Sequence, residues 1–202
     1  MSGQNKVSGV VLAGGMASRM QQRDKGLVIF KQRPLISYAL AAMQPVTDEL
    51  FISANRNRNQ YELFGFPVIS DSNVNFDGPL AGMLAAMQAA HYPLLLVMPC
   101  DSPFFTCQYL QQLLDALSDE TDVAVAFDGE RLHPVFVALK THLQIDLQAY
   151  LRQGERKLQN WLLRHNTVKV DLSLATDIFT NINTLSDLQK LESNVSNGPE
   201  SV

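Results

Sequence analysis

The sequence predicts an α/β fold in which a mixed, mostly parallel β-sheet lies between two layers of helices. Apolar runs of strand length recur along the chain with helix-patterned segments between them, as in consecutive βαβ units. Hydrophobic residues make up 46% and charged residues 18% of the 202 positions, which is typical of a globular protein. Chains of this length commonly fold around one core. We therefore expect one domain over residues 1–192, followed by a polar, disordered tail over residues 193–202.

The first half of the chain contains the apolar runs that we expect to form inner strands: Val7 to Leu12, Leu50 to Ser53, Val68 to Ser70 and Leu94 to Met98. Two sets of apolar residues recur at positions i, i+3, i+4 and i+7, which is the spacing of one helix face. They are Leu80, Met83, Leu84 and Met87, and then Leu110, Leu113, Leu114 and Leu117. We expect both sets to pack in the core.

The second half begins with two strand-like runs, at residues 121–127 and 133–139, separated only by the turn-rich sequence DGERL. Such a short connection predicts an antiparallel hairpin, so the sheet is expected to be mixed. Beyond the hairpin we expect helices at 143–153 and 155–165, short strands at 168–172 and 177–183, and a last helix at 185–192.

The overall charge limits which classes of partner the protein can bind. A formal net charge of −4 argues against broad binding to nucleic acid or to an anionic membrane, which both favour basic surfaces. No run of about eighteen apolar residues occurs, and the apolar run near the amino terminus is too short for a signal peptide. We therefore expect a cytoplasmic protein that binds neither nucleic acid nor membrane. Its two cysteines, Cys100 and Cys107, are too few for a disulfide scaffold and lack zinc-site spacing.

The first predicted strand ends in Gly14 and Gly15, with two basic residues, Arg19 and Lys25, in the same connection. Paired glycines let the backbone turn tightly, and exposed N–H groups in such a loop can bind phosphate oxygens. Cations beside this loop suit a polyphosphate whose charge grows during transfer. A plain strand-to-helix turn with solvated cations is the alternative. The spacing matches neither the P-loop nor the dinucleotide-binding motif.

Two aspartates follow apolar strands. Asp101 lies just past the run Leu94 to Met98, at the sheet edge where ligands of open α/β folds bind. Its carboxylate could hold Mg²⁺, which prefers oxygen ligands and bridges substrate phosphates. Asp71 follows the run Val68 to Ser70, and a carboxylate there can accept hydrogen bonds from a base. A turn or helix-cap role is the alternative for each.

Near the end of the chain Asn181 and Asn183 alternate with Ile182, so an extended backbone would point both amides to one face. Two amides on one face could bind the polar edge of a ligand. Capping of the following helix is the alternative. His133 precedes Pro134 in the predicted hairpin, and we assign it no catalytic role.

A series of short motifs spans nearly the whole chain: LAGG at 12–15, DKGL at 24–27, ANR at 54–56, SDS at 70–72, GPLAGM at 78–83, PCDSPF at 99–104, DGERLHP at 128–134 and NINT at 181–184. With these motifs the chain resembles the molybdenum cofactor guanylyltransferase family. LAGG with DK is found across a broad nucleotidyltransferase superfamily, whereas GPLAGM, PCDSPF and NINT narrow the resemblance. It implies a Rossmann-like, three-layer fold of the nucleotide-diphospho-sugar transferase type.

The resemblance implies a Mg²⁺-dependent transfer of GMP from GTP to the phosphate of molybdopterin or Mo-molybdopterin, with release of pyrophosphate. The part up to about residue 110 would bind the nucleotide, and the rest would bind the acceptor. The implied roles are phosphate binding by Leu12, Ala13, Gly14, Gly15, Arg19 and Lys25, metal binding by Asp101, base contacts by Ser53 and Asp71, a binding wall from Gly78, Pro79, Leu80 and Gly82, and acceptor contacts by Asn181 and Asn183.

The chain departs from the family pattern at two places. Family members have glycines between RM and DK, where this chain has Gln21 and Gln22, so we expect a stiffer loop. The family motif NANR begins with Asn, where this chain has Ser53. A hydroxyl cannot offer the two-sided hydrogen bonding of an amide, so the sequence defines the base less well than the reaction class.

Two alternative functions stay open: a sister nucleotidyltransferase with another base or acceptor, such as a pterin cytidylyltransferase or a sugar-phosphate enzyme, and a non-catalytic nucleotide-binding or cofactor-carrier module. The resemblance also implies a monomer. Its expected protein partners are a molybdenum-insertion protein and the maturation proteins of molybdoenzymes.

Overall fold

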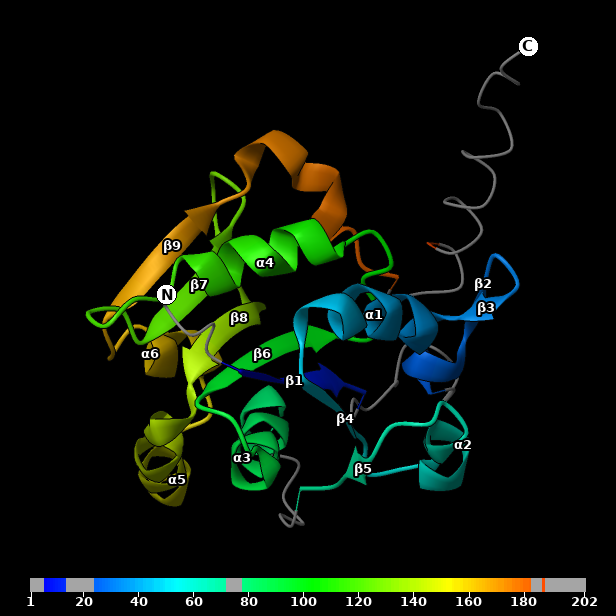
Figure 1. Ribbon diagram of the computed structural model, residues 1–202, viewed down its shortest axis with the longest axis horizontal. Helices are drawn as coiled ribbons and strands as arrows, with labels where there is room; N and C mark the ends of the chain where they lie inside the picture. The colour runs from blue at the N-terminus through cyan, green and yellow to red at the C-terminus, as the bar shows by residue number, and fades with distance from the viewer. Residues whose placement is uncertain (1–5, 14–23, 72–77, 183–186, 188–202) are drawn as a thin grey trace.

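A computed structural model of the protein describes residues 6–13, 24–71, 78–182 and 187. Its main sheet has seven strands in the order β5-β4-β1-β6-β8-β7-β9 (Figure 1). The strands are β1 (Val7–Leu12), β4 (Glu49–Ser53), β5 (Val68–Ile69), β6 (Leu94–Pro99), β7 (Val123–Phe127), β8 (Leu132–Lys140) and β9 (Thr167–Asp171). Strands from both halves of the chain thus share one sheet.

The sheet is mixed and mostly parallel, as predicted. β1 pairs in parallel with β4 and β6, β4 with β5, and β7 with β9. β8 runs antiparallel to both of its neighbours, β6 and β7. The predicted hairpin is therefore confirmed, because the short connection after Phe127 can join only antiparallel strands.

Helices cover both faces of the sheet, so the predicted three layers are confirmed (Figure 1). One face carries α1 (Leu35–Met43), α4 (Cys107–Asp115) and the 3₁₀ helix η4 (Ser173–Phe179), and the other carries α3 (Pro79–Ala89), α5 (Gln144–Arg152) and α6 (Leu158–Leu162). Neighbouring strand residues point to opposite faces. Val11 accordingly packs in the core under α1, and Val10 packs in the core under α3.

Smaller elements complete the described part of the chain. They are the 3₁₀ helices η1 (Lys25–Leu27), η2 (Gln44–Val46) and η3 (Thr141–Leu143), the hairpin β2 (Ile29–Phe30) and β3 (Arg33–Pro34), and the helix α2 (Arg58–Glu62). The hairpin turn places Lys31 and Gln32 at positive φ, 44° and 65°. Phe30 belongs to a small apolar cluster that also contains Ile182, so this hairpin packs against the end of the described chain.

The predicted strand at residues 177–183 is wrong. Residues 173–179 form η4, and the described residues after it, 180–182, are not in a strand. The backbone N–H of Leu172 donates to the Phe127 carbonyl at 2.8 Å, where β7 ends, so a strand continuing past this point would lose its partner. Ile178 and Phe179 instead bury their side chains in the core. The predicted helix at 155–165 is shorter, at Leu158–Leu162, and the one at 185–192 lies outside the described residues except for Asp187.

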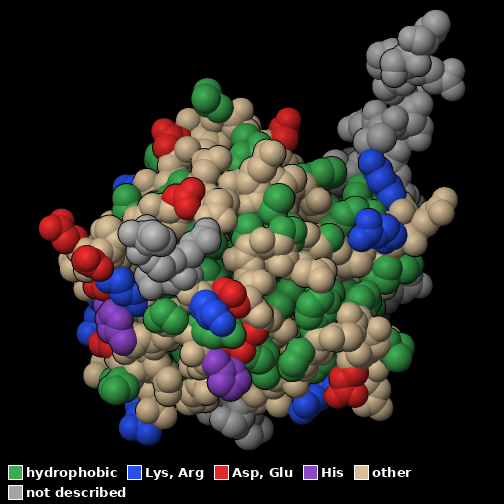
Figure 2. Space-filling view, in the orientation of Figure 1, with side chains coloured by type: hydrophobic (Ala, Val, Ile, Leu, Met, Phe, Trp, Pro, Cys, Tyr) green, Lys and Arg blue, Asp and Glu red, His purple; other side chains and the backbone are tan. Residues whose placement is uncertain are grey.

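Basic and acidic side chains are interspersed on the face of the molecule that Figure 2 shows. In the part of the chain that the structure describes, no helix has the length and apolar character needed to cross a membrane.

Gly9 in β1 allows a test of how tightly the neighbouring side chains pack against the centre of the sheet. A Cβ at this position would lie 2.7 Å from Thr47 Cγ2 and 2.9 Å from both Leu50 Cδ1 and Met43 Cε. Overpacking of this kind costs about 1–3 kcal/mol, so we expect Gly9→Ala to lower the free energy of unfolding by that amount. Urea denaturation would measure it, and an unchanged midpoint would show that α1 is not tightly packed against β1.

Candidate active site

The carboxyl ends of β1, β4 and β6 meet at one edge of the sheet. Leu12 lies between Ser53 and Pro99 in the strand register. Beyond the strands, the Ala13 N–H donates to the Ser53 carbonyl at 2.9 Å, and the Cys100 N–H donates to the Leu12 carbonyl at 3.1 Å. β4 pairs with one side of β1, and β6, which comes later in the chain, pairs with the other side. This is a topological switch point, where ligands of open α/β sheets bind.

Lys25 and Asp101 meet at this edge although 76 residues separate them. Lys25 Nζ lies 3.2 Å from Asp101 Oδ2, and the two side chains are 27% and 13% exposed. Partial burial reduces screening by water, so this pair retains more of its mutual attraction than a surface pair would. The predicted phosphate-binding cation and the predicted metal ligand are therefore next to each other.

The turn that carries Lys25 is anchored by its neighbours. Asp24 caps η1, and its Oδ1 accepts from the Gly26 N–H at 3.3 Å. Asp24 Oδ1 also accepts from the hydroxyl of Tyr61, and Asp24 Oδ2 accepts from Asn57 Nδ2 at 3.1 Å. Burial, with the nearby negative groups adding to it, raises the pKa of the Tyr61 phenol well above its usual range. Tyr61 is thus a neutral hydrogen-bond donor to Asp24.

Asn181 lies close to Asp101. The Ile182 N–H donates to the Asp101 carbonyl at 3.0 Å, and Ser102 Oγ donates to Asn181 Oδ1 at 2.5 Å. Ile182 is completely buried with Phe30. Asn181 and Ile182 therefore point in different directions even though the backbone is not a strand. Asn183 lies outside the described residues.

Asp71 lies at the outer side of the edge, next to the ANR motif. Its backbone N–H donates to Asn55 Oδ1 at 3.2 Å. Its own Oδ1 is buried and has no hydrogen-bond partner among the residues that the structure describes. A buried carboxylate oxygen is normally hydrogen-bonded, so this oxygen is a candidate acceptor for a donor from outside the described residues.

The start of α3 closes the edge from the side. Gly78 has φ of 64° and ψ of −150°, a conformation that is essentially restricted to glycine, and Pro79 follows it at the first helical position. A Cβ on Gly82 would lie 2.7 Å from Ser53 Oγ and 3.0 Å from Leu12 Cδ2. The close contact between α3 and the two strands thus requires glycine at position 82.

Two predicted binding residues are largely enclosed. The Ser53 side chain is 5% exposed, and its hydroxyl packs against Gly82. Leu80 is completely buried in the core under α3. The predicted residues Gly14, Gly15 and Arg19, like Gln21 and Gln22, lie outside the described part of the chain.

Four residues with a place in this site were not singled out from the sequence: Asp24, Asn55, Tyr61 and Ser102. Asn55 and Ser102 follow strands closely, as Asp71 and Asp101 do, so the same signal could have identified them. Asp24 is the first residue of the DKGL motif, but the motif gave it no role. No signal marked Tyr61, because nothing in the local sequence shows which turn its helix faces.

The described residues at this site offer few ligands for a metal ion. Within residues 6–13, 24–71, 78–182 and 187, no group of three or more His, Cys, Asp and Glu side chains is arranged to hold an ion. Mg²⁺ commonly binds one or two carboxylates together with substrate phosphates and water. Asp101, partly exposed at the sheet edge, fits such a site. Its neighbour Cys100 is buried, and burial raises the pKa of its thiol, so Cys100 has the properties of a packing residue rather than of a nucleophile.

His133 occupies a structural position. Its Nε2 lies 2.6 Å from Asp128 Oδ2, and its ring stacks on Phe179 with centroids 3.8 Å apart. Asp128 also accepts from the backbone N–H groups of Arg131 at 2.7 Å and Glu130 at 2.9 Å. The Arg131 N–H first, then His133 and the Glu130 N–H, hold the pKa of the Asp128 carboxyl well below its usual range.

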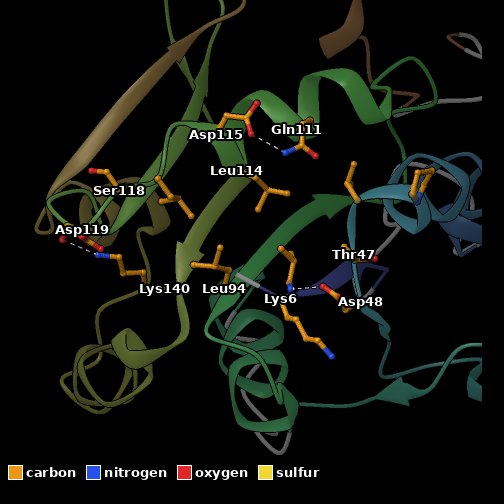
Figure 3. Close-up of a pocket in the computed structure, with 14 residues that line it drawn as sticks. Lys6, Thr47, Asp48, Leu94, Gln111, Leu114, Asp115, Ser118, Asp119 and Lys140 are labelled. Atoms are coloured by element: carbon orange, nitrogen blue, oxygen red, sulfur yellow. Dashed lines mark hydrogen bonds between the residues drawn. The ribbon is translucent and has the colours of Figure 1, made fainter. Parts of the chain in front are cut away.

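A cavity of about 600 Å³ opens at the opposite end of the sheet, where β1 and β6 begin (Figure 3). Charged groups in its lining form hydrogen bonds with other residues of the same lining. Asp115 Oδ1 accepts from Gln111 Nε2 at 2.8 Å, and Lys140 Nζ donates to the Asp119 carbonyl at 3.1 Å. Because ligands of such sheets bind at the carboxyl ends, we place the candidate active site at the other edge.

Comparison with known proteins gives a consistent result. A family model described as the MobA-like NTP transferase domain matches residues 9–168. A molybdenum cofactor guanylyltransferase from Shewanella halifaxensis is 42% identical over 193 residues, which cover 95% of this chain and 96% of the relative. The protein of the same name from Haemophilus influenzae is 42% identical over 185 residues, which cover 91% of this chain and 96% of the relative.

A solved structure shows the same fold. It is the molybdopterin-guanine dinucleotide biosynthesis protein A from Archaeoglobus fulgidus, with a TM-score of 0.76 and 23% identity, and the match covers 94% of this chain and 98% of that one. The predicted nucleotide-diphospho-sugar transferase type of fold is confirmed.

The bonds around Asp128 predict a pH dependence of stability. Because the pKa of Asp128 is lower in the folded protein, its ionised form stabilises the fold above the ordinary value of 3.8, and this contribution is lost as the pH falls below that value. We expect Asp128→Asn to be less stable than the wild type at neutral pH and the difference to shrink in acid. Denaturant unfolding at several pH values would measure it, and a constant difference would contradict the expectation.

Proposed function

We infer that this chain, which belongs to the MobA-like NTP transferase domain family, is a molybdenum cofactor guanylyltransferase. It transfers GMP from GTP to the terminal phosphate of molybdopterin and releases pyrophosphate. The product is the guanine dinucleotide form of the cofactor. Support comes from the names of relatives that align over nearly their whole length and from the arrangement at the carboxyl edge of the sheet.

The observation that carries the proposal is the Lys25–Asp101 pair at 3.2 Å. A cation and a carboxylate from distant parts of the chain meet where β1 and β6 end. Phosphoryl and nucleotidyl transfer need positive charge around the reacting phosphate and an oxygen ligand for a divalent ion. This pair supplies both groups at the position where the fold binds ligands.

In the proposed reaction an oxygen of the acceptor phosphate attacks the α-phosphorus of GTP. A new P–O bond forms as the bond from the α-phosphorus to the bridging oxygen breaks, and that oxygen leaves with its electron pair as pyrophosphate. The acceptor is already an anion, so the reaction needs no strong general base. Lys25 stabilises the charge that builds up on the triphosphate, and alignment of the two substrates supplies the rest of the rate enhancement.

We propose that Asp101 binds Mg²⁺ together with the nucleotide phosphates. Its side chain is 13% exposed at the sheet edge, and its carboxylate is the type of ligand that this ion prefers. When bound, the ion would neutralise phosphate charge and help to orient the leaving pyrophosphate. Lys25 lies close enough to act on the same phosphates.

Asp71 is the proposed base-reading residue. Guanine presents N1–H and an exocyclic amine on one edge, and a carboxylate can accept from both. Among the described residues the buried Asp71 Oδ1 has no hydrogen-bond partner, and in this proposal it accepts from one of these donors. Asn55 fixes the backbone of Asp71 at 3.2 Å and thus helps to orient it. Ser53, whose hydroxyl is enclosed, contributes less to base recognition than Asp71 in this proposal.

We further propose that the part up to about residue 110 binds the nucleotide and that the following part binds the acceptor within one domain. Asn181, held beside Asp101 by Ser102, would face the acceptor. Gly14, Gly15 and Arg19 keep their predicted role at the triphosphate, and Asn183 keeps its predicted role at the pterin. These four assignments rest on the motifs alone.

The cellular setting is also a proposal. We place the reaction in the cytoplasm, where GTP is made, and we expect the enzyme to act as a monomer. A molybdenum-insertion protein and the maturation proteins of molybdoenzymes are the expected partners, because direct transfer would protect a labile pterin. Any molybdenum that the acceptor carries is part of the substrate and is not held by a metal site of the protein.

Nucleotide choice tests the base-reading role. With Mg²⁺ and molybdopterin, we expect pyrophosphate release from GTP and from ITP, which keeps the N1–H, but not from CTP, UTP or ATP. Asp71→Asn should raise the KM for GTP by about 10- to 100-fold, because a charged hydrogen-bond acceptor is lost. Release from CTP instead would indicate a pterin cytidylyltransferase, and no release from any nucleotide would favour a carrier module or another acceptor.

Removal of the active-site cation tests the chemistry. We expect Lys25→Ala to lower kcat by about 100- to 1,000-fold, the usual effect of losing one preorganised charge-stabilising group. Lys140→Ala is the matched control, since Lys140 pairs with Asp122 at 3.1 Å and lies next to Leu94, where β6 begins. Steady-state pyrophosphate release measures both variants. Normal turnover by Lys25→Ala would contradict the assignment.

A further inference from the structure

Tyr61 connects the core to the turn that holds Lys25. It lies on α2, and its side chain is completely buried. Its hydroxyl donates to Asp24 Oδ1. A core residue therefore contacts the residue immediately before the proposed catalytic lysine.

Other hydrogen bonds converge on the same aspartate. Asp24 Oδ2 accepts from Asn57 Nδ2 at 3.1 Å, and the Asp24 carbonyl accepts from the Leu27 N–H at 3.1 Å. The Val28 N–H donates to the Lys25 carbonyl at 3.1 Å, which completes the 3₁₀ turn. Asp24 caps the turn that carries Lys25. Hydrogen bonds from Tyr61 on α2 and from Asn57, the residue before α2, hold Asp24 in place.

Gly26 also contacts the Tyr61 ring. A Cβ at Gly26 would lie 3.2 Å from Tyr61 Cε1 and only 2.5 Å from the Tyr61 oxygen, and real Cβ atoms essentially never lie as close to another atom as this second distance. The backbone after Lys25 therefore lies directly against the phenol. From this turn the Lys25 side chain extends to Asp101, and its Nζ lies 3.2 Å from Oδ2.

We propose that Tyr61 is a positioning residue for the nucleotidyl transfer, and that it acts through Asp24 to hold Lys25 at the triphosphate site before GTP binds. The role rests on the proposed function of Lys25. Holding the ammonium in place avoids the cost of ordering a long side chain when the substrates bind. Displacement by about 1 Å can cost about 100-fold in rate. A hydroxyl that never touches substrate would in this way affect kcat.

A purely structural role for Tyr61 makes a different prediction. If the ring only fills the core, phenylalanine should replace it with a loss of stability but no specific effect on Lys25. Tyr150 offers a matched control for this loss. It is also buried, and its hydroxyl donates to the Lys157 carbonyl at 3.0 Å, but it lies on α5 on the opposite face of the sheet.

The experiment compares Tyr61→Phe and Tyr150→Phe with the wild type by two measurements. The first is the labelling rate of Lys25 by an amine-reactive acetylating reagent without nucleotide, read by mass spectrometry. Lys140 serves as the internal reference, because it is also ion-paired and its side chain is 20% exposed, compared with 27% for Lys25. The second is pyrophosphate release with GTP, Mg²⁺ and molybdopterin, with thermal unfolding of each variant as a folding check.

In Tyr61→Phe we expect the labelling rate of Lys25 relative to that of Lys140 to rise several-fold. We expect kcat to fall about tenfold, which is a larger factor than the rise in the KM for GTP. Tyr150→Phe should change neither the labelling ratio nor kcat. Unchanged labelling of Lys25, or a normal kcat, would overturn the proposal. If labelling rises while the wild type releases no pyrophosphate from any nucleotide, positioning by Tyr61 stands and the proposed reaction fails.

Asn57→Gly provides a second variant in case Tyr61→Phe does not fold. Asn57 is exposed and has a φ of 50°, which glycine adopts without strain, so the change removes the amide but keeps the backbone. We expect the same direction of effect on Lys25 labelling and kcat, but a smaller size. If Tyr61→Phe does not fold, wild-type Lys25 labelling and kcat in Asn57→Gly would overturn the proposal that contacts from α2 position Lys25 through Asp24.

Discussion

Parallel pairing of β1 with β4 on one side and with β6 on the other is the constraint on which the site depends. Hydrogen bonds from Ala13 to Ser53 and from Cys100 to Leu12 continue this pairing to the last residues of the strands. The three strands therefore end at the same edge of the sheet. Helices α1 and α3 cover opposite faces, and Asn55 and Asp101 follow β4 and β6 closely at this edge, where ligands of open α/β sheets bind.

The edge is useful only because buried contacts hold the polar groups in place. Asp24 and Tyr61 anchor the turn with Lys25, and Ile182 in its small apolar cluster anchors the segment with Asn181. In both cases an apolar or neutral buried group carries the fixing contact, while the charged or amide group lies at the site. Rigid placement of this kind lets the protein stabilise charge during transfer without reorganising it.

Ile182 also ties the two parts of the chain together. Its N–H donates to the Asp101 carbonyl, and its side chain packs with Phe30 of the hairpin after η1. The proposed acceptor-binding segment is therefore joined to the element that carries the proposed metal ligand and to the element that follows Lys25. Donor and acceptor phosphates would meet between them, which is the arrangement that an in-line transfer needs.

Local patterns in the sequence were sufficient for the seven strands of the main sheet, for the antiparallel hairpin of β7 and β8, and for helices α3, α4 and α5, because alternation, helical spacing and turn chemistry act over a few neighbouring positions. They did not identify α1, α2 or the hairpin of β2 and β3. They were not sufficient at 177–183, where the absence of a strand partner beyond Phe127 outweighed the alternating pattern. Contacts such as Tyr61 with Asp24, Lys25 with Asp101 and Ser102 with Asn181 join residues 37, 76 and 79 positions apart. Which of these groups meet depends on how whole helices pack on the sheet, so they became visible only in the folded chain.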